Sequence, residues 1–150
     1  MRFNRSKISK VRFSSAVPTY VVRLLRYLGP WHAAKIYTGR VLDDGRRFVE
    51  VQEKVFGRSL FYPLPPREPE AGFDWGRYGT PCEELAYCLL ADACSTTIAE
   101  RYHQAFKREV VSQLKELWKL TSHDILTAVL KIQKSHDILT AVLKIQKEVK

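Results

Sequence analysis

The sequence predicts an α+β fold, and three features indicate it. Two stretches rich in β-branched and aromatic residues, 35–42 and 47–55, flank an Asp-Asp-Gly-Arg turn. From Thr80 onward, apolar residues recur at helical spacing. A chain of 150 residues, 45% of them hydrophobic, is long enough to bury one core. We therefore expect a small β-hairpin or three-stranded antiparallel sheet packed with three to four helices.

The predicted strands lie in the first half of a core domain that spans residues 33–125. Lys35–Leu42 and Arg47–Val55 are joined by Asp43-Asp44-Gly45-Arg46, a sequence typical of a hairpin turn. A third extended stretch, Ser59–Leu64, runs into proline-rich sequence, which favours a place at the edge of the sheet.

Two helices are predicted to follow. Thr80 as N-cap, Pro81 in the first turn and Glu83 three residues after the cap together form a capping box. Thr97 begins a second helix with the same signature. The buried face of the first helix is expected to comprise Cys82, Leu85, Ala86, Leu89, Leu90 and Ala93. That of the second is expected to comprise Tyr102, Phe106, Val110, Leu114 and Leu117, ending near Trp118.

The tail, residues 122–147, is a perfect tandem repeat. Residues 122–134 and 135–147 both read SHDILTAVLKIQK, and Ser122 is expected to cap this helix. At about 100° per residue, the second copy is rotated by about 220° relative to the first, so in one helix their apolar faces point in nearly opposite directions. We predict that the first copy docks on the body and buries Ile125 and Val129. The second copy is expected to self-associate or fold back rather than protrude, because its exposed face would form an apolar patch. The residues of that candidate interaction surface are Ile138, Leu139, Val142, Leu143 and Ile145.

Positive charge is concentrated at the N-terminus. Of the formal net charge of +9, residues 1–30 contribute +7, from seven cations and no acidic residue. Residues 1–16 are expected to form a flexible basic arm, and residues 17–30 an amphipathic helix. A cationic arm gains affinity for phosphate backbones through counterion release. The candidate nucleic-acid contacts are Arg2, Arg5, Lys7, Lys10, Arg12, Arg23 and Arg26. The alternatives are a solubilising tail, a targeting segment or an over-extended gene start.

A glycine-containing loop precedes the first predicted helix. Helix N-termini offer unpaired backbone N–H groups to anions. The residues of this weak candidate anion loop are Gly76, Arg77, Gly79 and Thr80. Their spacing matches neither a Walker loop nor a dinucleotide fingerprint, and glycine turns that bury Trp75 are the favoured interpretation.

No catalytic, cofactor or metal site is predicted. Cys82, Cys88 and Cys94, spaced by six residues on one helix, point in three directions, and the four histidines lack metal-ligand spacing. Glu100 and His103 are neighbours on a helix, but no nucleophile accompanies them. The odd number of cysteines favours a reducing, cytoplasmic compartment, and no apolar run is long enough to span a bilayer.

Short motifs distributed over about residues 35–125 resemble a known family. They are Ile36-Tyr37-Thr38-Gly39, Tyr62-Pro63-Leu64, Phe73-Asp74-Trp75-Gly76, Gly79-Thr80-Pro81, Leu85-Ala86, Leu89-Leu90-Ala91-Asp92, Tyr102-His103-Gln104-Ala105-Phe106-Lys107, Val110-Val111, Trp118-Lys119-Leu120-Thr121 and Asp124-Ile125. Their order is similar to that in small bacterial, archaeal and phage domains that carry only a domain-of-unknown-function label. The resemblance implies an α+β domain and transfers no activity.

These features favour a non-enzymatic binding or adaptor domain that acts through protein–protein surfaces. Its partner would be another protein or, through the duplicated tail, the chain itself. The alternative is a nucleic-acid-associated protein that uses the basic arm. A small-molecule-binding, anion-binding or enzymatic domain is the third interpretation.

Overall fold

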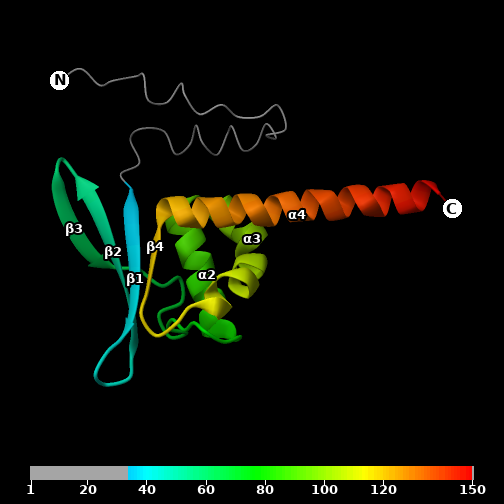
Figure 1. Cartoon of the computed structure of the whole chain (residues 1–150). Coiled ribbons are helices and arrows are strands. Elements are labelled where there is room, and N and C mark those ends of the chain that lie inside the picture. Colours follow the sequence, from blue (N-terminus) through cyan, green and yellow to red (C-terminus); the bar gives the residue numbers. More distant parts are fainter. Residues whose placement is uncertain (1–33, 150) are drawn as a thin grey trace, which may run out of the picture. The chain divides into compact units, whose positions relative to one another are not determined.

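A computed structural model describes residues 34–149. The predicted basic arm (1–16) and amphipathic helix (17–30) lie outside these residues. The elements in chain order are β1 (Lys35–Val41), β2 (Arg47–Val55), β3 (Arg58–Pro63), α2 (Thr80–Ala93), α3 (Thr96–Glu109), the 3₁₀ helix η2 (Val111–Gln113), β4 (Trp118–Thr121) and α4 (Ser122–Glu148). Figure 1 shows α2 and α3 on one face of the sheet, with α4 running from the end of β4 past both helices. The predicted α+β class is confirmed.

The sheet is antiparallel and has the strand order β3-β2-β1-β4. The predicted hairpin between β1 and β2 is confirmed. Its turn is closed by a 2.7 Å hydrogen bond from the Leu42 N–H to the Arg46 carbonyl, and Gly45 has φ 81°. Only glycine adopts that backbone conformation without strain. β3 lies at an edge of the sheet, as its prolines predicted.

β4 is the element that the sequence analysis missed. The predicted second helix was to continue to Trp118, and this is wrong: α3 ends at Glu109, and Leu117 is 70% exposed. Residues 118–121 instead pair with β1, with Leu120 opposite Tyr37. A helical pattern of apolar residues describes only local structure, whereas this strand is stabilised by a partner from the far end of the domain.

Close packing of two tryptophans seats β4 in the core. Trp118 lies opposite Gly39 in the ladder, and a Cβ atom on Gly39 would lie 2.1 Å from the indole ring. The glycine is therefore required because nothing larger fits between β1 and the ring. The indole of Trp75 meets that of Trp118 edge to face, with centroids 5.6 Å apart. The expected glycine turn beside a buried Trp75 is confirmed: Trp75 is 1% exposed, and of Gly76 and Gly79, the two glycines for which positive φ is expected, Gly76 has φ 72°.

The predicted buried face of α2 is confirmed, since all six residues are buried. In α3, Tyr102 and Phe106 are buried as predicted. The two predicted N-caps are wrong. Gly79 precedes α2 and provides no side-chain cap, so the capping box of Thr80 with Glu83 is not formed. Ser95 caps α3 in place of Thr97 by accepting a 3.2 Å hydrogen bond from the Ile98 N–H.

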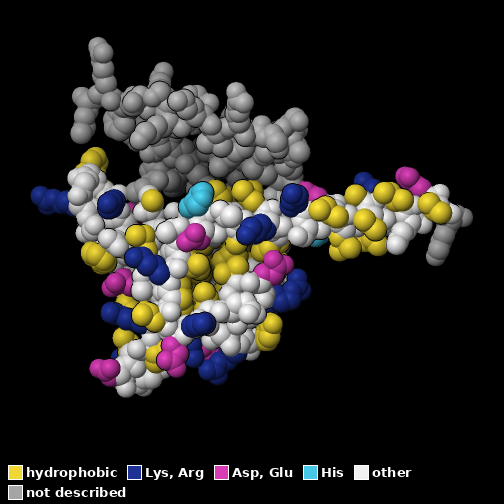
Figure 2. All heavy atoms as spheres, viewed as in Figure 1, with side chains coloured by type: hydrophobic (Ala, Val, Ile, Leu, Met, Phe, Trp, Pro, Cys, Tyr) yellow, Lys and Arg dark blue, Asp and Glu magenta, His cyan; other side chains and the backbone are white. Residues whose placement is uncertain are grey.

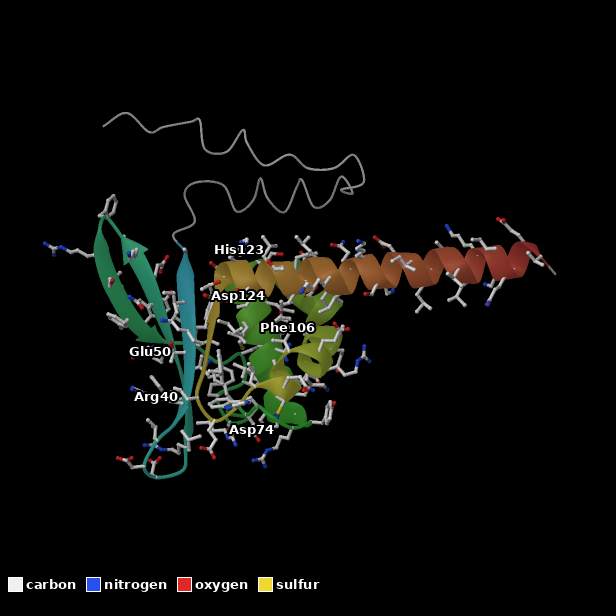
Figure 3. All side chains as sticks on the ribbon, viewed as in Figure 1. Arg40, Glu50, Asp74, Phe106, His123 and Asp124 are labelled. Carbon is white, nitrogen blue, oxygen red and sulfur yellow. The ribbon has the colours of Figure 1, made fainter. Side chains whose placement is uncertain are left out.

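α4 is one continuous helix of 27 residues. Its cap is Thr121 and not Ser122. The Thr121 hydroxyl accepts a hydrogen bond from the Asp124 N–H, and the Asp124 carboxylate accepts one from the Thr121 N–H. The predicted fold-back of the second copy is wrong, because Ser135 lies inside the helix and its hydroxyl donates to the Lys131 carbonyl at 3.1 Å. Figure 3 labels Asp124 and His123 at the start of this helix.

Candidate functional site

The second copy of the repeat exposes a face of large aliphatic side chains. The exposed fractions are 57% for Ile138, 59% for Leu139, 45% for Val142, 50% for Leu143 and 60% for Ile145. Figure 2 shows these hydrophobic side chains gathered along the half of α4 that extends beyond the body. We call this set, together with Val149 (82% exposed), the tail face. A contiguous exposed apolar surface of this kind is characteristic of interaction sites.

The same sequence is buried in the first copy. Ile125 and Val129 are 0% exposed, and Leu126 and Ile132 are 5% exposed. This part of α4 contacts α2, α3, β1 and β4. The prediction that the first copy docks on the body is therefore confirmed. The tail face repeats these four positions as Ile138, Val142, Leu139 and Ile145.

Continuity of the helix explains why only one copy docks. Thirteen residues turn the helix by about 220° beyond whole turns and advance it by about 20 Å. The tail face consequently points away from the direction in which Ile125 and Val129 meet the body. Because the fold-back is excluded, the second copy of a single chain protrudes, and none of residues 34–133 covers this face. Self-association stays a prediction.

The spacing within the tail face is that of a helix-pairing seam. Ile138, Val142, Ile145 and Val149 follow one another at intervals of four, three and four residues, which is the a/d pattern of a coiled coil. Val149 was not among the predicted surface residues. Its signal was present in the sequence, since the spacing continues past the end of the repeat.

The predicted anion loop lies beside a carboxylate of the chain itself. Asp74 accepts from Arg47 at 2.8 Å and from Arg77 at 3.1 Å, and Figure 3 labels it in the connection before α2. The Arg47 guanidinium also lies 4.7 Å from the centre of the Trp75 ring. Arg77, the cation proposed for an external anion, is thus already paired. Anion binding by Gly76, Arg77, Gly79 and Thr80 stays a prediction.

A polar cluster joins α3 to α2. His103 Nε2 lies 3.3 Å from Glu83, and the Lys107 ammonium lies 3.5 Å from the same carboxylate. His103 Nδ1 donates to the Ala99 carbonyl at 2.8 Å. Hydrogen bonding from Gln104, together with Lys107 and His103, lowers the pKa of Glu83. The carboxylate partner of His103 is thus Glu83 on α2, whereas the sequence suggested Glu100 on the same helix.

A second polar cluster joins β1 to α2. The Asp92 carboxylate accepts from the Lys35 ammonium at 3.1 Å and from the Tyr37 hydroxyl at 2.6 Å. Burial, followed by the bond to Asp92, raises the pKa of Tyr37, so the phenol stays protonated. Partial burial lowers the pKa of Lys35, but Asp92 outweighs it, and the net pKa is raised. This network fixes the first strand on the helix layer.

A shallow groove of about 330 Å³ lies beside this cluster. Its lining residues are Leu64, Pro65, Pro66, Arg67, Tyr87, Cys88, Ala91 and Asp92. Arg67 stacks 4.0 Å above the Tyr87 ring and pairs with the buried Glu84 at 3.0 Å. The two charged groups in its lining, Arg67 and Asp92, therefore already have partners in the chain. The tail face is the stronger candidate site.

The three cysteines of residues 34–149 are buried, and their thiols have raised pKa values. Burial raises the pKa of Cys88 and of Cys94 to about 11, and it also raises that of Cys82. These thiols are protonated at neutral pH and are weak nucleophiles. The described residues contain no group of three or more His, Cys, Asp or Glu placed to hold a metal ion. Within the same range, no helix is both long enough and apolar enough to cross a membrane.

Comparison with known proteins places the fold in a family. Residues 37–131 match a family of unknown function, DUF6166, whereas no curated protein and no solved structure matches the chain. The matched region includes most of β1, the other three strands, α2, α3 and the first ten residues of α4, and it ends before the second copy begins. Since this region is more than half of the chain, the chain belongs to the DUF6166 family.

Proposed function

We propose that this chain is a protein-binding domain. The family fold anchors α4, and the exposed tail face on that helix binds a partner protein. The observation that supports this function is the exposure of five aliphatic side chains in the second copy, whereas four of the five equivalent side chains in the first copy are buried. An amphipathic helix that lays its apolar face against another helical surface is a common mode of protein recognition. The first copy makes that kind of contact within the chain.

The geometry of the helix favours binding. α4 begins at Ser122, directly after the last residue of β4, so the tail face is attached to the sheet without a flexible linker. A face that is already helical loses little conformational entropy on binding. Each large aliphatic side chain contributes about 1.5–3 kcal/mol when it passes from full exposure to burial. Five half-exposed side chains therefore supply several kcal/mol, enough for an affinity that is moderate after the cost of association.

Site-specific photo-crosslinking in cells tests this function. A benzophenone amino acid replaces Val142 on the tail face or, as a matched control, Thr140. Both positions are exposed, and they lie about 200° apart on the same helix. We expect a crosslinked protein adduct from position 142 and none from position 140. No adduct at 142, or equal adducts at both positions, would contradict a protein-binding role for the face.

A second candidate function, contact with nucleic acid, follows from the charge distribution. Residues 1–30 hold +7 of the net +9 charge, and five of the cations lie in the first twelve residues. Neutralisation of seven phosphates gives a slope of about −6 in a plot of log affinity against log salt concentration. Removal of residues 1–16 should reduce this slope to about −2, with an unchanged melting temperature. Absence of retention on duplex DNA at about 50 mM salt would exclude this function.

A further inference from the structure

We propose that the partner of the tail face is a second copy of this chain, bound so that the two α4 helices pair in antiparallel orientation. This inference rests on the proposed protein-binding function and names the partner. It follows from the spacing of the face, from its charge and from the distance between the face and the body.

The tail face is complementary to itself. In an antiparallel pair of helices, an a residue of one helix packs against a d residue of the other. With Ile138 and Ile145 as d residues, and Val142 and Val149 as a residues, one register satisfies all four. Ile138 of each chain then lies opposite Val149 of the other, and Val142 lies opposite Ile145. Leu139 widens the same face, so a single two-fold contact covers most of the exposed apolar surface.

The charges favour the antiparallel orientation. The last two turns of α4 carry two positive side chains, Lys144 and Lys147, and one negative side chain, Glu148. A parallel pair would place Lys144 and Lys147 of both chains at the same levels along the seam, whereas the antiparallel register separates the two Lys147 residues by about 10 Å along the helix axis. Antiparallel helices also align their macrodipoles favourably.

The position of the seam leaves room for the partner. Gln133 is the last buried residue of α4, and Ile138 lies about 7.5 Å further along the axis. In the proposed register, Val149 of the partner chain lies opposite Ile138, directly after Glu148, the last residue of the partner's α4. The partner helix therefore stops short of the body, and the two bodies lie at opposite ends of the pair.

The size of the contact predicts its strength. The seam from Ile138 to Val149 is about 18 Å long. Two faces of this length bury less than the roughly 1,200 Å² of a standard interface, which places the pair among weak, reversible contacts. We therefore expect a concentration-dependent equilibrium between monomer and dimer.

Sedimentation velocity of the full chain between about 5 and 500 µM tests the pairing. The wild-type mass should rise from 17.4 kDa toward twice that value. Val142→Lys should stay monomeric, with dimerisation weakened by on the order of 10-fold or more. Thr140→Lys adds the same charge on the opposite side of the helix and should dimerise like the wild type. A wild-type chain that is monomeric throughout, or a Val142→Lys chain that dimerises equally well, overturns the pairing.

Disulfide trapping tests the orientation. A chain carrying Ile138→Cys is mixed with a chain carrying Val149→Cys under mild oxidation. The antiparallel register predicts a mixed disulfide in excess over either homodimer, and a dominant Ile138→Cys homodimer overturns that orientation. The native cysteines are buried and their pKa values are raised, so they react slowly.

The photo-crosslinked adduct separates this inference from the proposed function. An adduct from position 142 of twice the chain mass supports self-pairing. An adduct of another mass, from a chain that sediments as a monomer, overturns self-pairing and leaves the protein-binding function standing. The absence of both dimer and adduct overturns both.

Discussion

The two copies of the repeat have the same thirteen residues and opposite environments. Ile125 in the first copy is fully buried, and Ile138, its equivalent in the second, is 57% exposed. Both copies therefore have the side chains needed to dock on the body, and their position along the helix determines which one docks. The first copy has the body beside it, and the second has been carried past the body and turned away from it.

The residue before each copy also differs. Thr121 precedes the first copy and closes a capping box with Asp124, whereas Lys134 occupies the equivalent position before the second. The first copy thus starts a helix, and the second can only continue one. This difference and the neighbouring body account for the contrast between them.

Truncation of the equivalent isoleucines should give the largest difference. Ile125→Ala removes a fully buried side chain and should lower the free energy of unfolding by about 2–5 kcal/mol. Ile138→Ala changes an exposed side chain and should change it by less than about 0.5 kcal/mol. Chemical denaturation at low micromolar concentration measures both without contribution from self-association. Equal losses would show that the second copy is part of the core.

The same pair of variants also tests whether the copies exchange. In the Ile125→Ala chain, the second copy still carries an intact Ile138. If the second copy can dock in place of the first, Ile125→Ala will lower the free energy of unfolding less in the full chain than in a chain that has a single copy. We expect equal losses, because exchange would leave thirteen residues looped out between β4 and the docked helix.

Displacement of β4 should undock the first copy and so remove the difference in burial between the two copies. Gly39→Ala places a methyl group within the indole ring of Trp118 and should cost about 1–3 kcal/mol. Hydrogen exchange within residues 122–133 should then approach that of residues 135–147. Combining Gly39→Ala with Trp118→Leu, which removes the clashing ring atoms, should cost less than the sum of the two single changes. Additive losses would contradict the assigned contact.

Loss of the cap should weaken the first copy by a smaller amount. Thr121→Ala should cost about 0.5–2 kcal/mol, and Lys134→Ala, its equivalent before the second copy, should cost almost nothing. Thermal unfolding at neutral pH compares the two. A loss from Lys134→Ala as large as that from Thr121→Ala would show that the second copy has its own helix start.

The cap also predicts a dependence on acid. Hydrogen bonds from the Thr121 N–H and side chain hold the pKa of Asp124 below its usual value. Such a carboxylate stabilises the fold above its unfolded pKa of about 3.9, and this contribution is lost as the pH falls through the lower folded pKa. Asp124→Asn should therefore flatten the part of the acid limb that lies below about pH 4. An unchanged acid limb would contradict this role of Asp124.

Removal of one copy should have the smallest effect on folding. Deleting residues 122–134 or residues 135–147 yields the same chain, because the copies are identical. The remaining copy follows Thr121 and should dock, so the free energy of unfolding should change by less than about 0.5 kcal/mol. The binding of a dye for exposed apolar surface should fall. Failure of this chain to fold would mean that both copies are needed for the core.

Local signals predicted the local parts of this fold. The turn at Gly45 and the apolar spacing of α2 each depend on neighbouring residues, and both were found in the sequence. β4 was missed because its four residues are held by β1, more than 70 residues away in the ladder. The cap of α4 was misplaced by one position, because Thr121 and Ser122 are adjacent and have the same capping chemistry.

The candidate site was predictable to the same extent. The angle per residue and the repeat length of thirteen place the two apolar faces apart, so five of the six residues of the tail face were identified from the sequence, and Val149 was not. The pairing of Arg77 with Asp74, and of His103 with Glu83, was not identified. These contacts depend on how separate elements approach one another, which periodicity along one helix does not describe.

The direct junction between β4 and α4 makes the helix behave as a stiff lever. Its first copy is docked on the body, so at about 1.5 Å per residue the free arm from Gln133 to Glu148 is about 22 Å long. A tilt of about 10° of the docked part would move the far tip of this arm by roughly 4 Å. In an antiparallel pair, two such helices overlap by a fixed length, and this overlap fixes the distance between the two folded domains. Small rearrangements beneath Trp118 would then appear as changes in spacing at the level of the assembly.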